Sequence, residues 1–187
     1  MTPATLHESK ENVMTETVPE NSTPELEKAI DEALATNASR NVDFDTLAFQ
    51  TKAGAQFRRA QVRYIGSGAT GNHDGDENIL PADHFTFSNM VLPSGCVGPE
   101  HTHHDVEEVF FVLEGEVRFS VHDAGDGNKK ASRVLGRYDL LRVPAGVPRS
   151  LETVSAEDAR ICVIIGTQKP QLPTYPETSE MHGVTRD

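Results

Sequence analysis

The sequence predicts an all-β fold, a sandwich or barrel of short strands. Six β-prone runs follow one another from about residue 49: "RRAQVRYIG", "HFTFSNMVL", "EEVFFVLEG", "EVRFSVHD", "LLRVPAG" and "ARICVIIG". Clusters of Gly, Asp, Asn and Pro separate these runs, as in "GSGATGNHDGDENILPAD" and "DAGDGNKK". Several short strands with turn residues between them are typical of an all-β sandwich or barrel.

The length of 187 residues favours one domain with additional segments at both ends. We expect a disordered polar arm over residues 1–22, a short helix and connector over 23–48, the barrel over 49–166, and an extended tail with three prolines over 167–187. The barrel is therefore the part in which a functional site is expected.

The segment "TPELEKAIDEALA" predicts a short amphipathic helix outside the barrel. Thr23 can cap its N-terminus, and Pro24 suits the first helical position. Leu26, Ile30 and Leu34 recur every four residues and form one apolar stripe. Such a stripe needs a surface to cover, either the barrel or a partner subunit, and we expect a homodimer.

Charge and composition exclude several classes of partner. The net charge of -12 speaks against binding to nucleic acid or to an anionic membrane. No apolar stretch reaches the length of a membrane span, and the N-terminus lacks the apolar segment of a secretory signal. The two cysteines, Cys96 and Cys162, form no CxxC pair, so we expect no disulfide framework and a reducing, cytoplasmic location.

The stretch "GPEHTHHDVEEVFFVLEGE" places polar residues directly before an apolar run, where burial would be costly without a purpose. His101 and His103 are two residues apart, so on a strand they point to the same face. Glu108 begins the next apolar run and can join them inside a barrel. Two histidines and one carboxylate form a metal site with open positions for water, oxygen or substrate.

This stretch resembles the first motif of the cupin superfamily, in which a glycine, an H-x-H pair, a glutamate and a second glycine follow at fixed spacing. Gly95, His101, His103, Glu108 and Gly115 fill these positions. The resemblance implies a double-stranded β-helix, a jelly-roll barrel with a divalent metal ion at its mouth. It also implies His101, His103 and Glu108 as the metal ligands.

A second cupin motif is only partly kept. Gly136 and the Pro144-Ala145-Gly146 turn match its skeleton, but Arg149 stands where the family has its fourth ligand, a histidine. Thr153 stands where the family has asparagine. Arginine stays protonated and cannot ligate a metal, so the resemblance leaves three ligands.

Three alternatives remain open for Arg149. It pairs with an anionic substrate beside a three-ligand metal, or it replaces the metal by pairing with Glu108, or it turns outward to Glu152 or Asp139. We favour the first alternative, with Arg149 as a substrate-binding residue. The apolar Phe110 and Val112 would then exclude water from the substrate.

These features predict a metal-dependent oxidoreductase, a dioxygenase-like enzyme that cleaves a small anionic enol, diketone, phenol or similar acid. Fe(II) is the favoured cofactor, with Mn(II), Ni(II) or Zn(II) as other possibilities. The alternatives are a non-catalytic ligand-binding or sensory cupin, and a cupin isomerase or lyase. The partner in each case is a small molecule, and no residue is assigned a catalytic role in acid–base chemistry.

Overall fold

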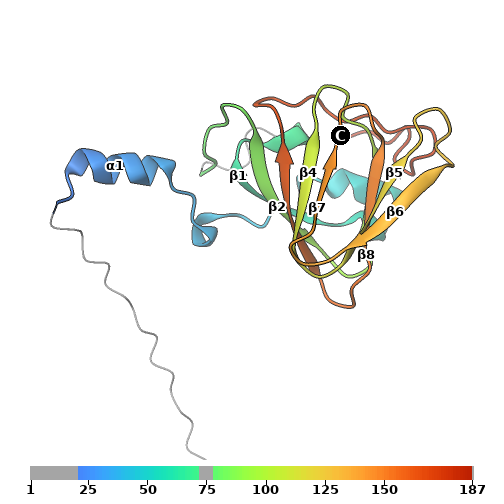
Figure 1. Cartoon of the computed structure of the whole chain (residues 1–187), viewed down its shortest axis with the longest axis horizontal. Coiled ribbons are helices and arrows are strands. Elements are labelled where there is room, and N and C mark those ends of the chain that lie inside the picture. The colour runs from blue at the N-terminus through green and yellow to red at the C-terminus, as the bar shows by residue number, and fades with distance from the viewer. Residues whose placement is uncertain (1–20, 72–77, 187) are drawn as a thin grey trace, which may run out of the picture. The chain divides into compact units, whose positions relative to one another are not determined.

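The structure is a computed structural model that describes residues 21–71 and 78–186 (Figure 1). Most of the predicted disordered arm, residues 1–20, lies outside the described residues. The chain divides into two compact units, residues 1–34 and 35–187. No helix in the described part of the chain is both long enough and apolar enough to cross a membrane.

The first unit contains helix α1 (Pro24–Ala33), which forms where the sequence predicts it. The Thr23 hydroxyl accepts a hydrogen bond from the Leu26 amide at 3.4 Å, and Pro24 opens the first turn. Such a cap satisfies one of the free N–H groups at the start of a helix. The helix buries none of its residues, and the side chains of the apolar stripe are exposed.

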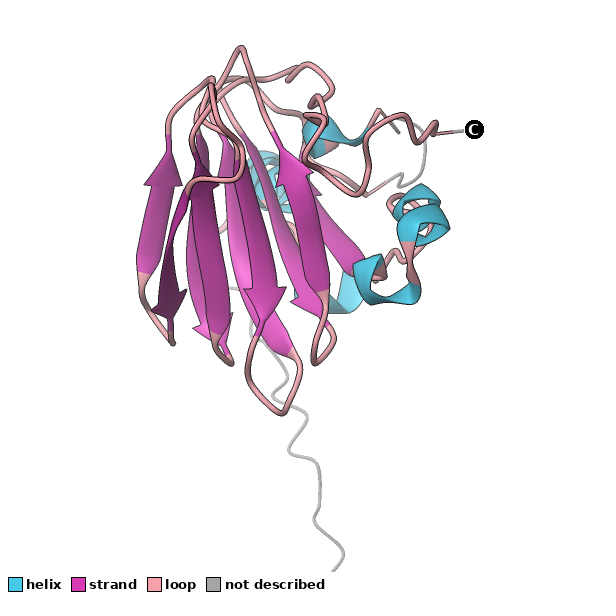
Figure 2. Cartoon of the chain, turned by 90° about the vertical axis from the view of Figure 1, so that its right-hand side faces the viewer, coloured by secondary structure: helices cyan, strands magenta, loops and turns pink. Residues whose placement is uncertain are grey.

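The second unit contains the strands and four short 3₁₀ helices (Figures 1 and 2). The strands are β1 (Ala60–Ile65), β2 (Thr86–Leu92), β3 (Val97–His101), β4 (Glu108–Glu114), β5 (Val117–His122), β6 (Lys130–Leu135), β7 (Leu140–Val143), β8 (Arg149–Thr153) and β9 (Ala159–Ile165). The 3₁₀ helices are η1 (Asn37–Ser39), η2 (Ala48–Ala53), η3 (Ala55–Phe57) and η4 (Gly68–Thr70).

Two antiparallel sheets make up this unit. One has the strand order β1-β2-β9-β4-β7 and the other the order β3-β8-β5-β6. Consecutive strands alternate between the sheets at several points, and this arrangement is a jelly-roll β-barrel. The predicted fold class is therefore confirmed.

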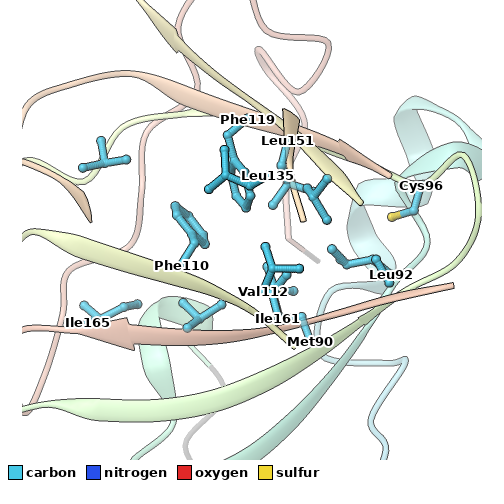
Figure 3. Packing of buried hydrophobic residues seen from close by; sticks show 14 of the residues in the cluster. Met90, Leu92, Cys96, Phe110, Val112, Phe119, Leu135, Leu151, Ile161 and Ile165 are labelled. Carbon is cyan, nitrogen blue, oxygen red and sulfur yellow. The ribbon is translucent and has the colours of Figure 1, made fainter. Parts of the chain in front are cut away.

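The interior of the barrel is apolar away from its mouth (Figure 3). Phe110 of β4 and Phe119 of β5 meet across the two sheets, with ring centroids 5.0 Å apart. Val112, next on the inward face of β4, is completely buried in the same core. Burying each side chain of this size stabilises the fold by about 1.5–3 kcal/mol. This core provides a rigid support for the polar residues at the start of β4.

The chain crosses from β4 in one sheet to β5 in the other through a tight turn at Gly115. This glycine has φ +76°, and a Cβ atom there would lie 2.8 Å from Cβ of Ala159. A larger residue would therefore meet both backbone strain and a steric clash. The register of β4 is set by its two neighbours in the sheet, where Glu108 pairs with Val143 of β7 and Ile165 of β9.

Candidate metal centre

The polar residues of the first motif lie around the end of β3 and the start of β4. Strand β3 ends at His101, which pairs with Arg149 of β8. The segment that follows is held by backbone hydrogen bonds on two sides. Thr102 bridges to Thr174 of the C-terminal tail, and the Gly146 amide donates to the His103 carbonyl at 2.7 Å. The Pro144-Ala145-Gly146 turn thus helps to position His103.

The side chains of His101, His103 and Glu108 converge. Nε2 of His101 lies 3.6 Å from Oε2 of Glu108, and Nε2 of His103 lies 3.8 Å from the same oxygen. One ligand atom from each residue lies within 4.8 Å of the other two. Three such atoms can surround one ion at ordinary ligand distances, so the group is a possible site for a divalent metal.

The orientation of His101 turns one ring nitrogen toward Glu108. Its Nδ1 lies 2.9 Å from the Pro99 carbonyl oxygen, which can only accept, so Nδ1 donates this hydrogen bond. The other ring nitrogen, Nε2, faces the Glu108 carboxylate, 3.6 Å from its Oε2. A histidine held through a carbonyl in this way is also typical of metal ligands.

The charges of His103 and Glu108 also suit metal binding. Burial lowers the pKa of His103 to about 4, so this ring is neutral at pH 7. Burial pushes the pKa of Glu108 upward, but the hydrogen bond and charge of His101, with His103 and Arg149, outweigh it and bring this pKa to about 2. A neutral imidazole and an ionised carboxylate are the forms that bind metals.

Arg149 lies inside the barrel and is almost completely buried, with 1% of its surface exposed. Its Nε donates to Oε2 of Glu108 at 3.1 Å, and its Nη1 donates to the Val147 carbonyl at 2.9 Å. The outward alternative is not what the structure shows, because Glu152 pairs with Arg118 instead. Burial lowers the pKa of Arg149 while the charge of Glu108 raises it, and the group stays protonated.

A cavity of about 80 Å³ opens beside the three converging residues. The lining includes His101, His103, Glu108, Phe110, Met90, Val163 and Ile165 from the barrel, Gln50, Arg59, Gln61 and Ser88 from the first half of the chain, and Pro173, Tyr175 and Arg186 from the tail. Phe110 therefore faces the cavity, and its contact with a substrate stays a prediction. Arg149 and Val112 are not among the lining residues.

Arg59 is a site residue that sequence reasoning missed. It lies between η3 and β1, it is buried with 7% of its surface exposed, and it faces the cavity. It belongs to no motif, and in the run "RRAQVRYIG" it cannot be told from its exposed neighbour Arg58. The contribution of the tail was missed too: the hydroxyl of Tyr175 accepts a hydrogen bond from Gln50 at 3.0 Å.

Other polar residues close to the three ligands in the sequence point elsewhere. Nε2 of His104 lies 2.7 Å from the Thr174 hydroxyl, and Glu107 pairs with Arg142 at 3.1 Å. Neither residue lines the cavity. Cys96 belongs to the apolar core, where burial raises the pKa of its thiol.

Comparisons with known proteins show what part of the chain and its fold are similar to. Residues 88–165 match the family described as "Cupin domain". Two solved structures share the fold: Peruvianin-I, a cysteine peptidase from Thevetia peruviana latex, and a structure described as giving insights into the mechanism of oxalate oxidase. Peruvianin-I is 16% identical, with TM-score 0.57 over 86% of this chain and 83% of that chain. The oxalate oxidase structure is 18% identical, with TM-score 0.54 over 88% and 75%.

At these identities the likenesses concern the fold alone. A third structure, the Schizosaccharomyces pombe Cnp3 cupin domain, is 14% identical with TM-score 0.45 over 58% of this chain, and the chain covers 64% of its length. No curated protein sequence matches the chain. The domain match over residues 88–165, together with the jelly-roll fold, supports a small protein of the cupin superfamily.

Proposed function

We propose that this cupin is a metal-dependent enzyme of the oxygenase type that acts on a small oxygen-bearing acid. The observation that carries the proposal is the convergence of His101, His103 and Glu108 at the wall of a cavity. A structural metal site is closed by its ligands, whereas a catalytic one keeps positions open. Three protein ligands beside a cavity correspond to the second kind.

Fe(II) is the metal we favour for this site. Two histidines and one carboxylate with open positions form the ligand set of non-haem iron oxygenases. The same nitrogen and oxygen donors also suit Mn(II), Ni(II) and Zn(II). When bound, the metal supplies Lewis acidity toward the substrate oxygens and a site at which O₂ can react.

The residues of the chain prepare the site for this chemistry. His103 is neutral and Glu108 is ionised at pH 7, so neither needs to lose a proton before it binds a cation. Arg149 holds Oε2 of Glu108 through its Nε at 3.1 Å and thereby limits the rotation of the carboxylate. Phe110, Val163 and Ile165 give the cavity an apolar side that excludes water from the substrate.

Oxygen consumption tests this proposal directly. The protein is loaded anaerobically with Fe(II) and mixed with a panel of small enols, diketones, phenols and hydroxy acids in aerated buffer. We expect uptake of O₂ with at least one acid, and loss of both bound iron and uptake in His103→Ala. Glu107→Gln is the matched control, since Glu107 lies beside the ligand but pairs with Arg142 outside the cavity. Bound iron without any uptake would contradict the oxygenase proposal.

A second candidate function is that of a non-catalytic binder of small anions. The observation that favours it is the ion pair between Arg149 and Glu108, which supplies the carboxylate with a counter-charge without any metal. Metal content separates the two candidates. Stoichiometric Fe or Mn in purified protein supports the enzyme, whereas a protein that takes up neither ion from excess supports the binder.

A further inference from the structure

Arg59 has an unusual environment for a buried arginine. Its only polar contact with the described residues is a long hydrogen bond of 3.4 Å from Nη1 to the Phe57 carbonyl. Its Nε is buried without a hydrogen-bond partner, and it forms no ion pair with any described residue. Burial lowers the pKa of the guanidinium, and the charges of Cys96, Tyr175 and Glu108 offset this only in part; an arginine stays charged at neutral pH.

The other large buried arginines each have a carboxylate. Arg149 pairs with Glu108 at 3.1 Å, and Arg63 pairs with Asp43 at 3.4 Å. A buried charge without a partner costs several kcal/mol. Arg59 has no such partner. It faces a cavity in which the lining carboxylate, that of Glu108, is already paired with Arg149. No described carboxylate lies within ion-pair distance of Arg59, and an anion that enters the cavity would supply one.

Two further side chains of the same cavity have unused polar atoms. Oε1 of Gln50 and Oε1 of Gln61 are buried and have no partner among the described residues. Their amide nitrogens donate to the Tyr175 hydroxyl at 3.0 Å and to the Ser88 hydroxyl at 3.2 Å. Buried amide groups with free hydrogen-bonding capacity indicate a ligand that bears complementary polar groups.

We propose that Arg59 is the anion-binding residue of this cavity, and that its ligand is a small carboxylate that carries a hydroxyl or similar polar group near the carboxylate. The planar guanidinium matches a carboxylate with two parallel hydrogen bonds. A buried water takes up about 10–15 Å³ of cavity volume, so a cavity of about 80 Å³ holds only a few non-hydrogen atoms. Gln50 and Gln61 would bind the second polar group.

This inference rests on the proposed function for one point, that the rest of the ligand faces His101, His103 and Glu108. It moves the role of anion recognition from Arg149 to Arg59. Arg149 has a carboxylate partner and does not line the cavity, whereas Arg59 lacks a partner and does. The two arginines thus differ in both properties that matter for binding an external anion.

Calorimetry with glycolate as the probe tests the inference. Binding is measured for the wild type, Arg59→Met and Arg58→Gln, each with bound metal and after chelation. Arg58 is the matched control, because it is the adjacent residue, has the same charge and is exposed. We expect Arg59→Met to weaken glycolate binding at least tenfold and Arg58→Gln to change it less than twofold. Acetate, which lacks the hydroxyl, should bind more weakly than glycolate.

Unfolding by urea distinguishes ligand binding from a structural role. Removing an unpaired buried charge should leave Arg59→Met at least as stable as the wild type in the absence of ligand. Arg59→Lys keeps the charge but loses the paired donors, and it should bind glycolate with intermediate affinity. A destabilised Arg59→Met together with normal binding by Arg59→Lys would overturn the inference.

The outcomes separate this inference from the proposed function. If the protein binds no metal but glycolate binding still depends on Arg59, the inference stands and the metal-dependent enzyme does not. If metal binds and the affinity for glycolate is the same in the wild type and Arg59→Met, the inference is wrong and the metal site remains. Failure of glycolate to bind the wild type in either state would also overturn it.

Discussion

The two buried arginines Arg149 and Arg59 lie at the beginnings of strands in different sheets and have different surroundings. Arg149 begins β8 in the four-stranded sheet, and its Nε donates to Glu108. Arg59 directly precedes β1 in the five-stranded sheet, and it has no carboxylate partner in the described chain. The comparison shows that burial of a cation alone does not define its role. A paired cation restrains a neighbouring side chain, whereas an unpaired one beside a cavity is available to a ligand.

Replacing Arg149 with methionine should have the largest effect on the free energy of unfolding. Glu108 would keep its charge but lose its buried partner, which costs about 3–5 kcal/mol of unfolding free energy. We expect urea unfolding of chelated protein to show a loss of this size. Arg142→Met is the control, since Arg142 and Glu107 form an exposed pair worth about 1 kcal/mol or less. Equal losses of unfolding free energy in the two variants would show that the buried pair of Arg149 and Glu108 stabilises the fold no more than the exposed pair.

Acid should weaken the site through His103. The pKa of His103 is about 4 in the folded protein, below the ordinary value of 6.5. As the pH falls, His103 is therefore protonated in the unfolded chain before it is protonated in the folded protein. Stability contributed by the neutral ring is complete above pH 6.5 and is lost progressively down to about pH 4. The loss amounts to about 3 kcal/mol over this window.

His103→Asn, which does not titrate, tests this assignment in chelated protein. The unfolding free energy of the wild type should fall more steeply between pH 6.5 and 4 than that of the variant. Parallel curves for the two proteins would show that His103 is not the group responsible.

Replacing Arg149 with histidine separates the two remaining alternatives for this residue. In one, Arg149 accompanies a three-ligand metal, and in the other it replaces the metal by pairing with Glu108. The variant places a fourth nitrogen donor where the cupin motif has one, and metal affinity should rise about tenfold, or about 1.4 kcal/mol. Competition with a fluorescent chelator measures this change. If the wild type binds no metal and the variant does, Arg149 replaces the metal. If both bind and only the affinity differs, Arg149 accompanies a three-ligand metal. Unchanged metal binding would show that Arg149 neither accompanies the metal nor replaces it.

The predicted homodimer concerns the other unit of the chain and should have the smallest effect on the barrel. Leu26 and Ile30 of α1 are 62% and 61% exposed, and Leu34 directly after the helix is 55% exposed. Such an apolar stripe needs a surface to cover, and we expect a partner subunit to supply it. We expect sedimentation at micromolar concentration to show a dimer, and Ile30→Asp to shift it toward the monomer without changing the urea midpoint of the barrel. A monomeric wild type would contradict this prediction.

Local patterns in the sequence predicted the barrel and the convergence of the first motif. The spacing of His101, His103 and Glu108 is set by one strand end and the next strand start, so it can be read from nearby residues. The strands β3, β6 and β8 were not among the six predicted runs. Four of the six residues of β6 are exposed, and β8 buries the polar side chains of Arg149 and Thr153. Neither strand therefore shows the usual apolar alternation.

Long-range pairing decided the rest of the site. The tail reaches the cavity because Thr174 bridges to Thr102, and Arg186 donates from its Nη1 to the Thr70 carbonyl at 2.6 Å. Whether Arg59 is paired depends on which carboxylates the fold brings near it, and this cannot be read from one run of sequence. The motif consequently directed attention to Arg149, while the cavity is lined by Arg59.

The central claim is that His101, His103 and Glu108 together hold one metal ion. Anomalous diffraction from crystals soaked in Mn(II) tests it most directly. We predict a single strong anomalous peak about 2.0–2.3 Å from Nε2 of both histidines and from a carboxylate oxygen of Glu108. A peak at other residues, or none at this position in crystals that bind the ion elsewhere, would contradict the account.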